Sequence, residues 1–497
     1  MARPGKTAAG TEQKSNRQGS RREQAESMHR NFLLYFLGRA LPSACGLLLI
    51  VFYTRLLSPE EYGRYTFIVA VIFFGNALFY HWIRIALLRF SLKGAGNRKV
   101  KRIAAKAFVL SSLISLAYTA PICLVSLGDY SLPTLLLIPL LLMLHAWFET
   151  HLELLRASIR PLEYSAMNLT KSLLGLLLGT LLVYWGYGVA GALVGLFGSL
   201  AAIAAISIFR HWRPREVLRG ISGTAIRHIF LLTFPMSCGV VFTFFIIWLD
   251  RSLLIYFHGE QANGLFSAVH DLTRFSMNVI FVSVQLVGFP LAINAFRKHG
   301  LDRSNEQLNL NLDQLLLFSI PMFFGIVALR REICFVLLGP EFAAFGASLI
   351  SLVAVSSFLE QLKSQYVDIR FLIQKKPREF FKAFLVLVLV ALVCKPLFIS
   401  RWAGLGAALS TIAMHALGLG ISFAFLGARL GLRLDLRRTA AYLLAAGAMY
   451  ATIQALPGGG GAVRLGLLVA AGAAAYFGTL ALLFISNRQA RKRTRCR

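Results

Sequence analysis

The sequence predicts an all-α polytopic membrane protein that crosses the bilayer with about 14 transmembrane helices. Of its 497 residues, 57% are hydrophobic and only 15% are charged, and the mean hydropathy is +0.65. Soluble domains have roughly 45–50% apolar and about 25% charged residues. Apolar runs of at least about 18 residues recur along the chain, and each is long enough to cross a hydrocarbon core of about 30 Å. A transmembrane β-barrel would instead show short segments of alternating hydrophobicity.

The predicted spans follow the apolar runs in order, and polar or turn-forming residues separate them. They cover residues 31–53, 64–87, 107–127, 132–155, 164–186, 188–209, 229–249, 264–290, 312–329, 343–368, 380–399, 403–426, 439–456 and 463–486. The turn-like stretch WGYG at 185–188 divides the fifth span from the sixth. The polar, basic residues 1–30 contain no apolar run, so we expect a disordered tail and no cleaved signal peptide.

Basic residues are distributed unevenly between the two sides of the predicted membrane. Of the 52 Lys and Arg residues, 39 fall on one side, 8 on the other and 5 within spans. Cytoplasmic loops carry the excess of Lys and Arg in membrane proteins. The pattern predicts cytoplasmic N- and C-termini, and it accounts for the formal net charge of +30 without nucleic acid, for which no binding motif is present.

The sequence shows no motif for catalysis, a metal or a cofactor. The cysteines are Cys45, Cys123, Cys238, Cys334, Cys394 and Cys496. None forms a CxxC motif, and five of them lie in or beside apolar spans, so we expect neither a disulfide framework nor a metal site. A nucleophile elbow, a P-loop and HExxH are absent, and PGGGG at 457–461 follows no strand, which favours an outward hairpin loop.

A short motif follows the first span and returns in looser form after the seventh. RLLSPEEYGRY occupies 55–65, and RSLLIYFHGEQANGLF occupies 251–266. Each copy has an Arg, an acidic residue, a Gly that allows a tight turn, and an aromatic residue (Tyr65 or Phe266) suited to the water–lipid boundary. The spacing indicates two six-helix lobes in parallel orientation followed by two more helices. Transporters often bind substrate between such repeats.

The segments around this motif carry a family resemblance. LGRALPSACGLLLIVFYTRLLSPEEYGRYTF resembles the first helix and turn of bacterial polysaccharide flippases, and FPMSCGVVFTFFIIWLDRSLLIYFHGEQANGLFSAVHDL (234–272) resembles the start of their second half. These are the Wzx-like exporters of O-antigen and exopolysaccharide. Their multidrug/oligosaccharidyl-lipid/polysaccharide exporter superfamily also contains MATE drug antiporters and lipid II flippases. The resemblance implies a MATE-like V of two lobes in the bacterial inner membrane, which opens alternately to each side.

The implied organisation is a chain of six segments. These are the cytoplasmic tail 1–30, the N-lobe 31–209, the cytoplasmic linker 210–228, the C-lobe 229–426, the two further helices within 427–487, and the basic cytoplasmic tail 488–497.

The implied function is the translocation of undecaprenyl-diphosphate-linked oligosaccharide repeat units for surface polysaccharide biosynthesis, without enzymatic activity or a cofactor. The implied partners are the lipid-linked substrate, a polysaccharide polymerase, glycosyltransferases and H⁺ or Na⁺ as coupling ion. A MATE-like antiporter of cationic drugs is an alternative, although it would need an acidic cavity. A membrane glycan polymerase or ligase is disfavoured by the short outer loops. A scaffold for a glycan-synthesis complex also stays open.

Cations within the predicted spans are the main candidates for substrate binding, because each costs about 2.5–3.5 kcal/mol to insert. They are Arg39, Arg84, Lys171, Arg274 and Lys363. We expect them to give the cavity between the lobes a positive field that replaces the hydration of a diphosphate. Arg84 and Lys363 lie near cytoplasmic span ends, so an alternative is that they extend to the interface.

Spacing along the helices suggests partners for two of these cations. Glu360 stands three residues before Lys363 and could pair with it. His270 or Asp271 could pair with Arg274, in which case Arg274 would have a structural role.

Polar residues at helical spacing accompany the cations. The residues expected to line the cavity and bind sugar hydroxyls are Ser43, Asn168, Ser267, Asp271, Asn278 and Glu360. In span four, His145 and Glu149 are candidates for ion coupling, with a structural role equally open. Glu153 and Arg156 on the same face are expected to form an ion pair. His415 stands alone on an apolar helix, which favours packing.

Overall fold

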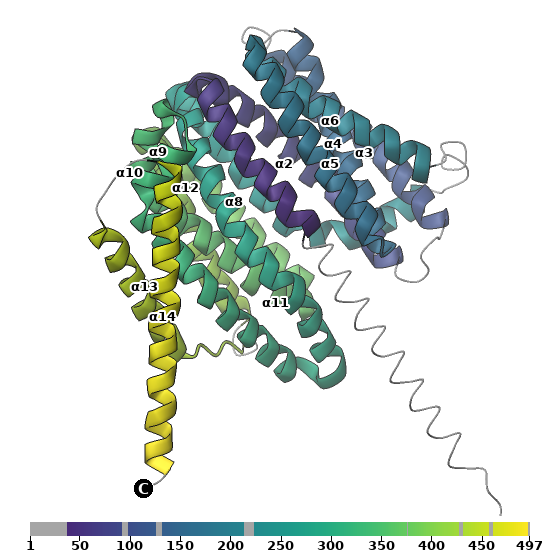
Figure 1. The fold of residues 1–497 in the computed structure, drawn as a ribbon. Helices are drawn as coiled ribbons and strands as arrows, with labels where there is room; N and C mark the ends of the chain where they lie inside the picture. The colour runs from purple at the N-terminus through teal and green to yellow at the C-terminus, as the bar shows by residue number, and fades with distance from the viewer. Residues whose placement is uncertain are drawn as a thin grey trace, which may run out of the picture.

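The computed structural model is a bundle of long helices (Figure 1). It describes residues 37–91, 98–125, 132–212, 223–374, 376–426, 431–456 and 461–495. No strand occurs within these ranges, which confirms the all-α class. The expectations of a disordered tail at 1–30 and of a hairpin loop at PGGGG concern residues outside the described ranges, apart from Gly461.

The helices follow one another with short connections. After the helix Leu37–Leu56, the bounds are α2 Pro59–Ser91, α3 Arg98–Val125, α4 Leu132–Ala157, α5 Pro161–Leu182, α6 Gly188–His211, α8 Gly223–Ala328, α9 Arg330–Leu337, α10 Pro340–Leu362, α11 Asp368–Ile373, α12 Pro377–Leu426, α13 Leu436–Ala455 and α14 Ala462–Arg495. The π-helical turns Val183–Tyr187 and Lys363–Val367 join α5 to α6 and α10 to α11. Because α14 runs to Arg495, it extends into the predicted tail at 488–497.

Residues with a left-handed backbone interrupt the longest helical segments. Gly259 and Gly300, with φ of 84° and 81°, break α8, and Ala403, with φ of 44°, breaks α12. Gly186, with φ of 89°, lies in the turn between α5 and α6 and confirms the division at WGYG. The chain can therefore reverse direction inside each of these segments.

Membrane-spanning length and composition agree with the predicted class. Among the described residues, nine helices are long and apolar enough to cross a membrane, with Pro161–Arg210, Ile226–Ala328 and Arg378–Leu426 each taken as one. These three contain the breaks named above. The α13 helix is not among the nine, and the total of fourteen spans stays a prediction.

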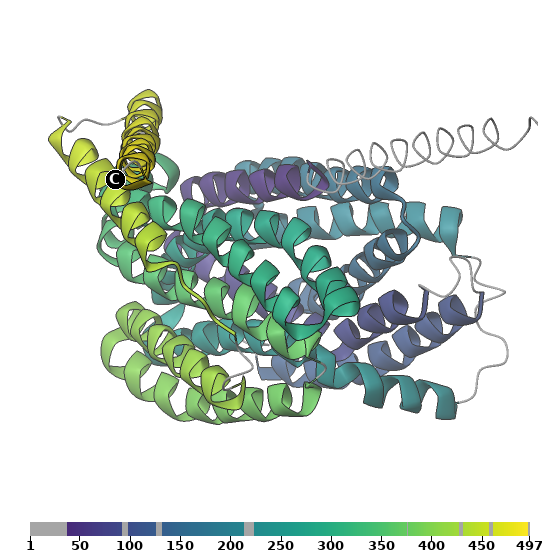
Figure 2. The same cartoon turned by 90° about the horizontal axis from the view of Figure 1, so that it is seen from below.

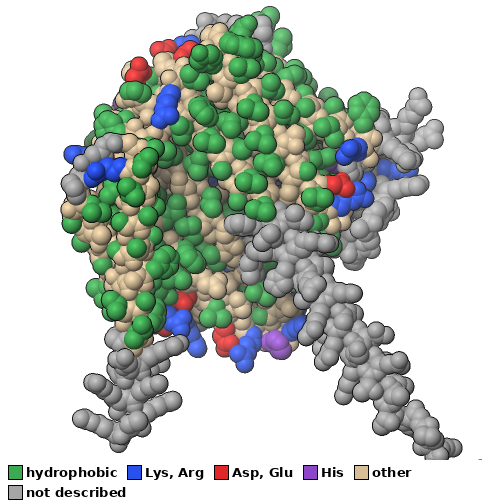
Figure 3. Space-filling model, viewed as in Figure 1, with side chains coloured by type: hydrophobic (Ala, Val, Ile, Leu, Met, Phe, Trp, Pro, Cys, Tyr) green, Lys and Arg blue, Asp and Glu red, His purple; other side chains and the backbone are tan. Residues whose placement is uncertain are grey.

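Large hydrophobic side chains cover the outside of the helices. Figure 3 shows a broad area of hydrophobic side chains, with charged side chains gathered toward its edges. Phe209, Val463 and Leu482 are 89%, 81% and 71% exposed. A protein in water rarely exposes so large an apolar surface, whereas lipid tails accommodate it.

The interior contains separate hydrophobic clusters. One is built from residues between Ile68 and Trp212, and another from residues between Cys238 and Leu480. A third joins Tyr53 and Tyr62 to residues of α8, α10 and α12. We call the helices within residues 37–212 the early helices and those from α8 onward the late helices. Figure 2 shows them as two neighbouring groups. The division into lobes at 31–209 and 229–426 stays a prediction consistent with this packing.

The SPEE stretch of the motif begins a helix, so α2 starts earlier than the predicted residue 64. The Ser58 hydroxyl accepts a hydrogen bond from the Glu61 backbone N–H at 3.2 Å, and the Glu61 carboxylate accepts one from the Ser58 backbone N–H at 3.0 Å. This is a capping box, and Pro59 occupies the first helical position. The connection from the helix Leu37–Leu56 is therefore only two residues long.

The two motif copies pack against each other through their glycines. A Cβ at Gly63 would lie 3.0 Å from the Gly264 nitrogen, and a Cβ at Gly264 would lie 3.0 Å from the Gly63 nitrogen. Neither glycine has a left-handed φ, so the predicted role in tight turns is wrong. Their role is to bring α2 against α8. Phe266 is only 3% exposed, so its predicted position at the water–lipid boundary is also wrong.

Polar contacts extend this α2–α8 seam, which we define by Gly63, Gly264 and the residues that bond across them. Asn263 donates to the Gly63 carbonyl at 2.8 Å, and Arg251 donates to the Thr66 carbonyl at 2.6 Å. Arg64 forms an ion pair with Glu260. Since all of these groups join an early helix to a later one, the seam fastens the two helical groups together at one end.

Candidate functional site

A cavity of about 770 Å³ lies between the early helices and α8. Its walls come from the helix Leu37–Leu56, α2, α4, α5, α6 and α8, together with Gln365. This volume lies toward the upper end of the range for small-molecule binding sites. Tyr53 and Tyr65, whose ring centroids are 5.1 Å apart, lie at the cavity end next to the α2–α8 seam.

All charged lining residues belong to the early helices. They are Arg39, Arg84, Arg156 and Lys171 with Glu149 and Glu153. The formal excess is two positive charges, with histidines counted as neutral. No Lys, Arg, Asp or Glu from α8 onward is among the described lining residues. The cavity therefore has one charged wall and one uncharged wall.

Two of these cations are paired with carboxylates. Arg84 contacts Glu149 at 3.0 Å, and Arg156 contacts Glu153 at 3.5 Å, which confirms the predicted Glu153–Arg156 pair. Arg84 is 9% exposed, so this guanidinium lies within the protein and does not extend to the interface. Each pair cancels one charge of each sign.

Arg39 and Lys171 have neutral neighbours instead. The Arg39 Nε donates to the Tyr164 hydroxyl at 3.4 Å, and the Lys171 Nζ lies 5.8 Å from the centroid of the Phe148 ring. Neither cation has a carboxylate within 4.0 Å among the described residues. Their charges are therefore the two that remain to act on a ligand in the cavity.

Two histidines lie close to these charges. His145 stacks on Phe73 with 4.8 Å between ring centroids, and it lines the cavity together with Glu149. The Nδ1 of His81 is buried and has no hydrogen-bond partner within the described part of the chain. Both imidazole rings lie close enough to the Arg84 guanidinium to interact with its positive charge.

The uncharged wall combines polar and apolar side chains. Asn278, Ser283 and Gln365 supply amide and hydroxyl groups, while Phe244 and Phe275 supply aromatic surface. Amides, hydroxyls and aromatic faces are suited to a neutral, hydroxyl-rich ligand, since they offer both donors and acceptors beside apolar area.

The structure brings eight of the predicted site residues to this cavity. They are Arg39, Ser43, Arg84, His145, Glu149, Asn168, Lys171 and Asn278. The predictions of substrate binding and ion coupling remain predictions for these residues.

Five predicted site residues are not among those that line the cavity, because partners elsewhere hold them. Ser267 donates to Asn263 at 3.1 Å, and Asp271 accepts two bonds from Arg251 at 2.7 and 2.8 Å. The other three are Arg274, Glu360 and Lys363.

The predicted partners of two cations are wrong. Arg274 contacts Glu360 at 3.4 Å instead of His270 or Asp271, and Lys363 contacts Asp368 at 2.7 Å instead of Glu360. Helical spacing described only neighbours on the same helix. The Arg274–Glu360 contact joins residues 86 positions apart, which no local pattern can indicate.

Sequence reasoning missed several lining residues on α2. Asn76 and His81 line the cavity together with Arg84, and Tyr65 and Phe73 extend the same wall. The signal was available, because Asn76 and His81 stand eight and three residues before Arg84 on one helix face.

Taken together, the fold and the cavity define a polytopic helical membrane protein with a cation-rich central site. A family model described as "Polysaccharide biosynthesis protein" matches residues 52–347. The match spans more than half of the chain, and the chain belongs to this family. No curated protein matches the sequence.

Solved structures of transporters share the fold. The lipid II flippase MurJ in an inward closed conformation is 15% identical with a TM-score of 0.72, over 91% of this chain and 99% of that one. A MATE multidrug transporter in an inward-facing conformation is 14% identical with a TM-score of 0.56, over 79% and 99%. A superfamily member from Pyrococcus furiosus, described as having a binding pocket of reverse polarity, is 12% identical with a TM-score of 0.57, over 80% and 95%.

Proposed function

We propose that the protein is a flippase of the bacterial inner membrane that translocates undecaprenyl-diphosphate-linked oligosaccharide repeat units. The central cavity between the helical groups would hold the headgroup, and the polyprenyl tail would stay in lipid. Membership of the polysaccharide biosynthesis family and the transporter fold support this function. The product would be O-antigen or exopolysaccharide, with a polymerase and glycosyltransferases as partners.

The observation that carries the proposal is the excess of two positive charges on one cavity wall. A lipid-linked diphosphate is a dianion, and crossing the membrane requires replacement of its hydration by charged donors. Arg39 and Lys171 supply those donors, because neither is neutralised by a carboxylate. A cationic drug would experience repulsion in the same place, which argues against a MATE-like antiporter of cations.

The remaining lining groups would bind the sugars. Ser43 and Asn168 lie beside the charged wall of the cavity. The uncharged wall contributes Asn278, Ser283 and Gln365. A headgroup oriented by its diphosphate on Arg39 and Lys171 would place its sugars across the cavity against these amides and hydroxyls.

Alternating access would depend on the α2–α8 seam. We place the seam on the outer side and the Arg39 end of the cavity on the cytoplasmic side, in accordance with the distribution of Lys and Arg. Headgroup entry from the cytoplasm would then be followed by separation of the seam. His145 and Glu149 would couple this cycle to H⁺ or Na⁺.

The test is export in cells that depend on this protein for surface polysaccharide. Arg39→Ala and Lys171→Ala should each reduce surface polysaccharide to background with unchanged abundance in the membrane. Lys171→Arg should retain export, because it keeps the charge. Arg401→Ala, at an exposed position outside the cavity, is the matched control. Wild-type export by both alanine variants, or resistance to cationic drugs on expression, would contradict the proposal.

A further inference from the structure

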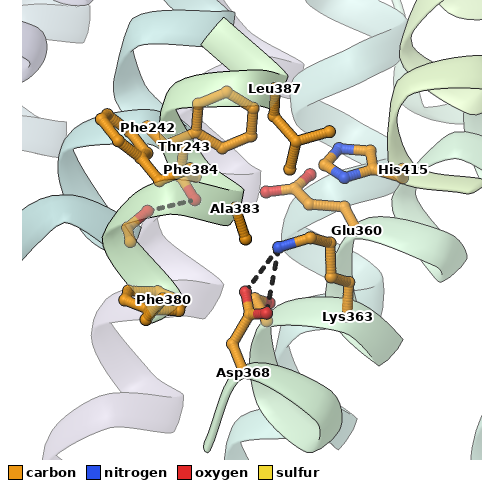
Figure 4. A pocket seen from close by; sticks show the side chains of 12 residues that line it. Phe242, Thr243, Glu360, Lys363, Asp368, Phe380, Ala383, Phe384, Leu387 and His415 are labelled. Carbon is orange, nitrogen blue, oxygen red and sulfur yellow. Dashed lines mark hydrogen bonds and ion pairs between the residues drawn. The ribbon is translucent and has the colours of Figure 1, made fainter. Parts of the chain in front are cut away.

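A second, smaller cavity of about 20 Å³ lies among α8, α10 and α12 (Figure 4). Glu360, Lys363, Asp368 and His415 line it, and Phe380 and Phe384 are part of its apolar wall. A cavity of this size holds about one water molecule. Neither the proposed binding of the headgroup nor the predicted coupling residues use this cluster.

The two carboxylates of the cluster are held differently. Asp368 accepts two bonds from the Lys363 ammonium, at 2.7 and 3.0 Å. Glu360 accepts two contacts from Arg274, both at 3.4 Å, beyond the usual range of about 2.7–3.2 Å for such bonds. Glu360 is only 8% exposed, so it has little water to replace a strong partner. It is therefore the weakly held carboxylate of the pair.

His415 provides a second observation that points to the same place. The ring is 7% exposed and lines the cavity with Glu360. Its Nδ1 is buried and has no hydrogen-bond partner among the residues that the structure describes. Buried polar atoms nearly always have a partner, and a water molecule in this cavity would supply one.

The charged groups that face this site come from several helices. Around Glu360 they are Arg274 and His270 from α8, His415 from α12 and Lys363 next to α10. His415 also faces Lys395, which is itself bonded to Asp250 at 2.5 Å. With the histidines neutral, Arg274 and Lys363 balance Glu360 and Asp368. Of these two carboxylates, Glu360 has the weaker contact with its cation, so it is the one that accepts an additional proton more readily.

We propose that Glu360 and His415 form a proton-binding site that controls Arg274. A proton from water would pass through the cavity to the Glu360 carboxylate, with His415 as relay, and produce a neutral carboxylic acid. The acid would no longer retain the guanidinium of Arg274. Arg274 immediately precedes Phe275 and stands four residues before Asn278, both of which line the central cavity. Its release would add a positive charge to the uncharged wall.

This inference rests on the proposed function, because it assumes that the central cavity binds an anion. Proton binding at Glu360 then strengthens binding of the diphosphate. By reciprocity, the diphosphate strengthens binding of the proton. The two ligands would bind together on the same side of the membrane.

The proton site is tested first on the full-length protein without ligand. Infrared difference spectra between about pH 8 and about pH 5 should show the carbonyl stretch of a buried carboxylic acid. Glu360→Gln should remove this band, and His415→Asn should move its pH midpoint. Asp313→Asn, a carboxylate on another part of α8, is the control and should retain the band. A wild-type spectrum without the band, or a band that survives in Glu360→Gln, overturns the proposal.

The coupling is tested with dimethyl diphosphate, whose charge is constant over this pH range. Wild-type affinity should rise about tenfold as the pH falls, a size typical of coupled sites. Glu360→Gln should bind tightly at every pH, and Arg274→Gln weakly at every pH. A Glu360→Gln protein that keeps the wild-type pH dependence overturns the coupling. If the wild type binds no dimethyl diphosphate at all, the proposed function fails, and the infrared band alone decides the proton site.

Discussion

Arg39 and Lys171 differ from the other cavity cations in the chemistry of their neighbours. A phenol hydroxyl and an aromatic ring hold them in place without cancelling their charge. Arg84 and Arg156 are neutralised by Glu149 and Glu153. At the residue scale, therefore, the cavity separates cations available to a ligand from cations that maintain the wall.

The Arg84–Glu149 pair gives a prediction about stability. Arg84→Gln removes the buried guanidinium and leaves the Glu149 carboxylate, which is partly exposed in the cavity wall, without its 3.0 Å partner. The Tm should therefore fall by a few degrees. Arg84→Gln combined with Glu149→Gln should recover most of the loss. Thermal unfolding of the purified single and double variants measures this coupling. Losses that simply add would contradict the assigned pairing.

At the scale of elements, the α2–α8 seam depends on the absence of two side chains. A Cβ on Gly63 would meet the backbone of Glu260 and Gly264, which cannot rotate aside as a side chain can. Asn263, Arg251 and Arg64 then bond across the contact. The seam therefore requires backbone contact first and is reinforced by polar groups second.

Gly63→Leu should separate α2 from α8 and open the seam. Thr66, which is 2% exposed, can report this opening after replacement by Cys in a background without other cysteines. Labelling of Thr66→Cys by a membrane-impermeant thiol reagent from outside the cell should rise several-fold when Gly63→Leu is added. Gly447→Ala, at a position with open space around it, should not change the labelling. Equal labelling with and without Gly63→Leu would rule out this role for the glycine contact.

Local sequence patterns predicted the elements better than their contacts. Hydropathy located the helices, and WGYG located the division between α5 and α6, because both depend on neighbouring residues. The role of Gly63 was mistaken, since a helical glycine that permits packing looks like a turn glycine in sequence. The partner of Arg274 was mistaken because Glu360 reaches it from another helix. Arg39 and Lys171 could be predicted as lining residues because a charge within an apolar helix is conspicuous from that helix alone, whatever the other helices place beside it.

At the scale of the whole molecule, the orientation in the membrane gives a further prediction. The breaks at Gly259 and Gly300 lie at opposite ends of the middle part of α8. With cytoplasmic termini, alkaline phosphatase inserted at Gly259 should be active outside the cytoplasm, and the same insertion at Gly300 should be inactive. The reverse pattern would invert the proposed direction of access.

The whole-molecule account joins three features: a cavity of about 770 Å³, an unneutralised pair of cations on one wall, and a seam that fastens one end. Each has a separate consequence for transport. In the proposed function, the cavity would accommodate a headgroup, Arg39 and Lys171 would select an anionic one, and the seam would separate to release it. The apolar exterior in Figure 3 would allow the tail of such a lipid to stay in the bilayer.

Headgroup translocation by the purified protein in liposomes tests the central claim most directly. The substrate would be a fluorescent undecaprenyl-diphosphate-linked oligosaccharide, and quenching by a membrane-impermeant reagent would report its movement between leaflets. We expect translocation to be faster with the wild-type protein than in protein-free liposomes. Lys171→Gln should reduce the translocation rate at least about tenfold, because one charge-assisted contact is lost, and Lys171→Arg should retain the wild-type rate. Translocation by the wild type no faster than in protein-free liposomes, or equal rates for the wild type and Lys171→Gln, would contradict the account.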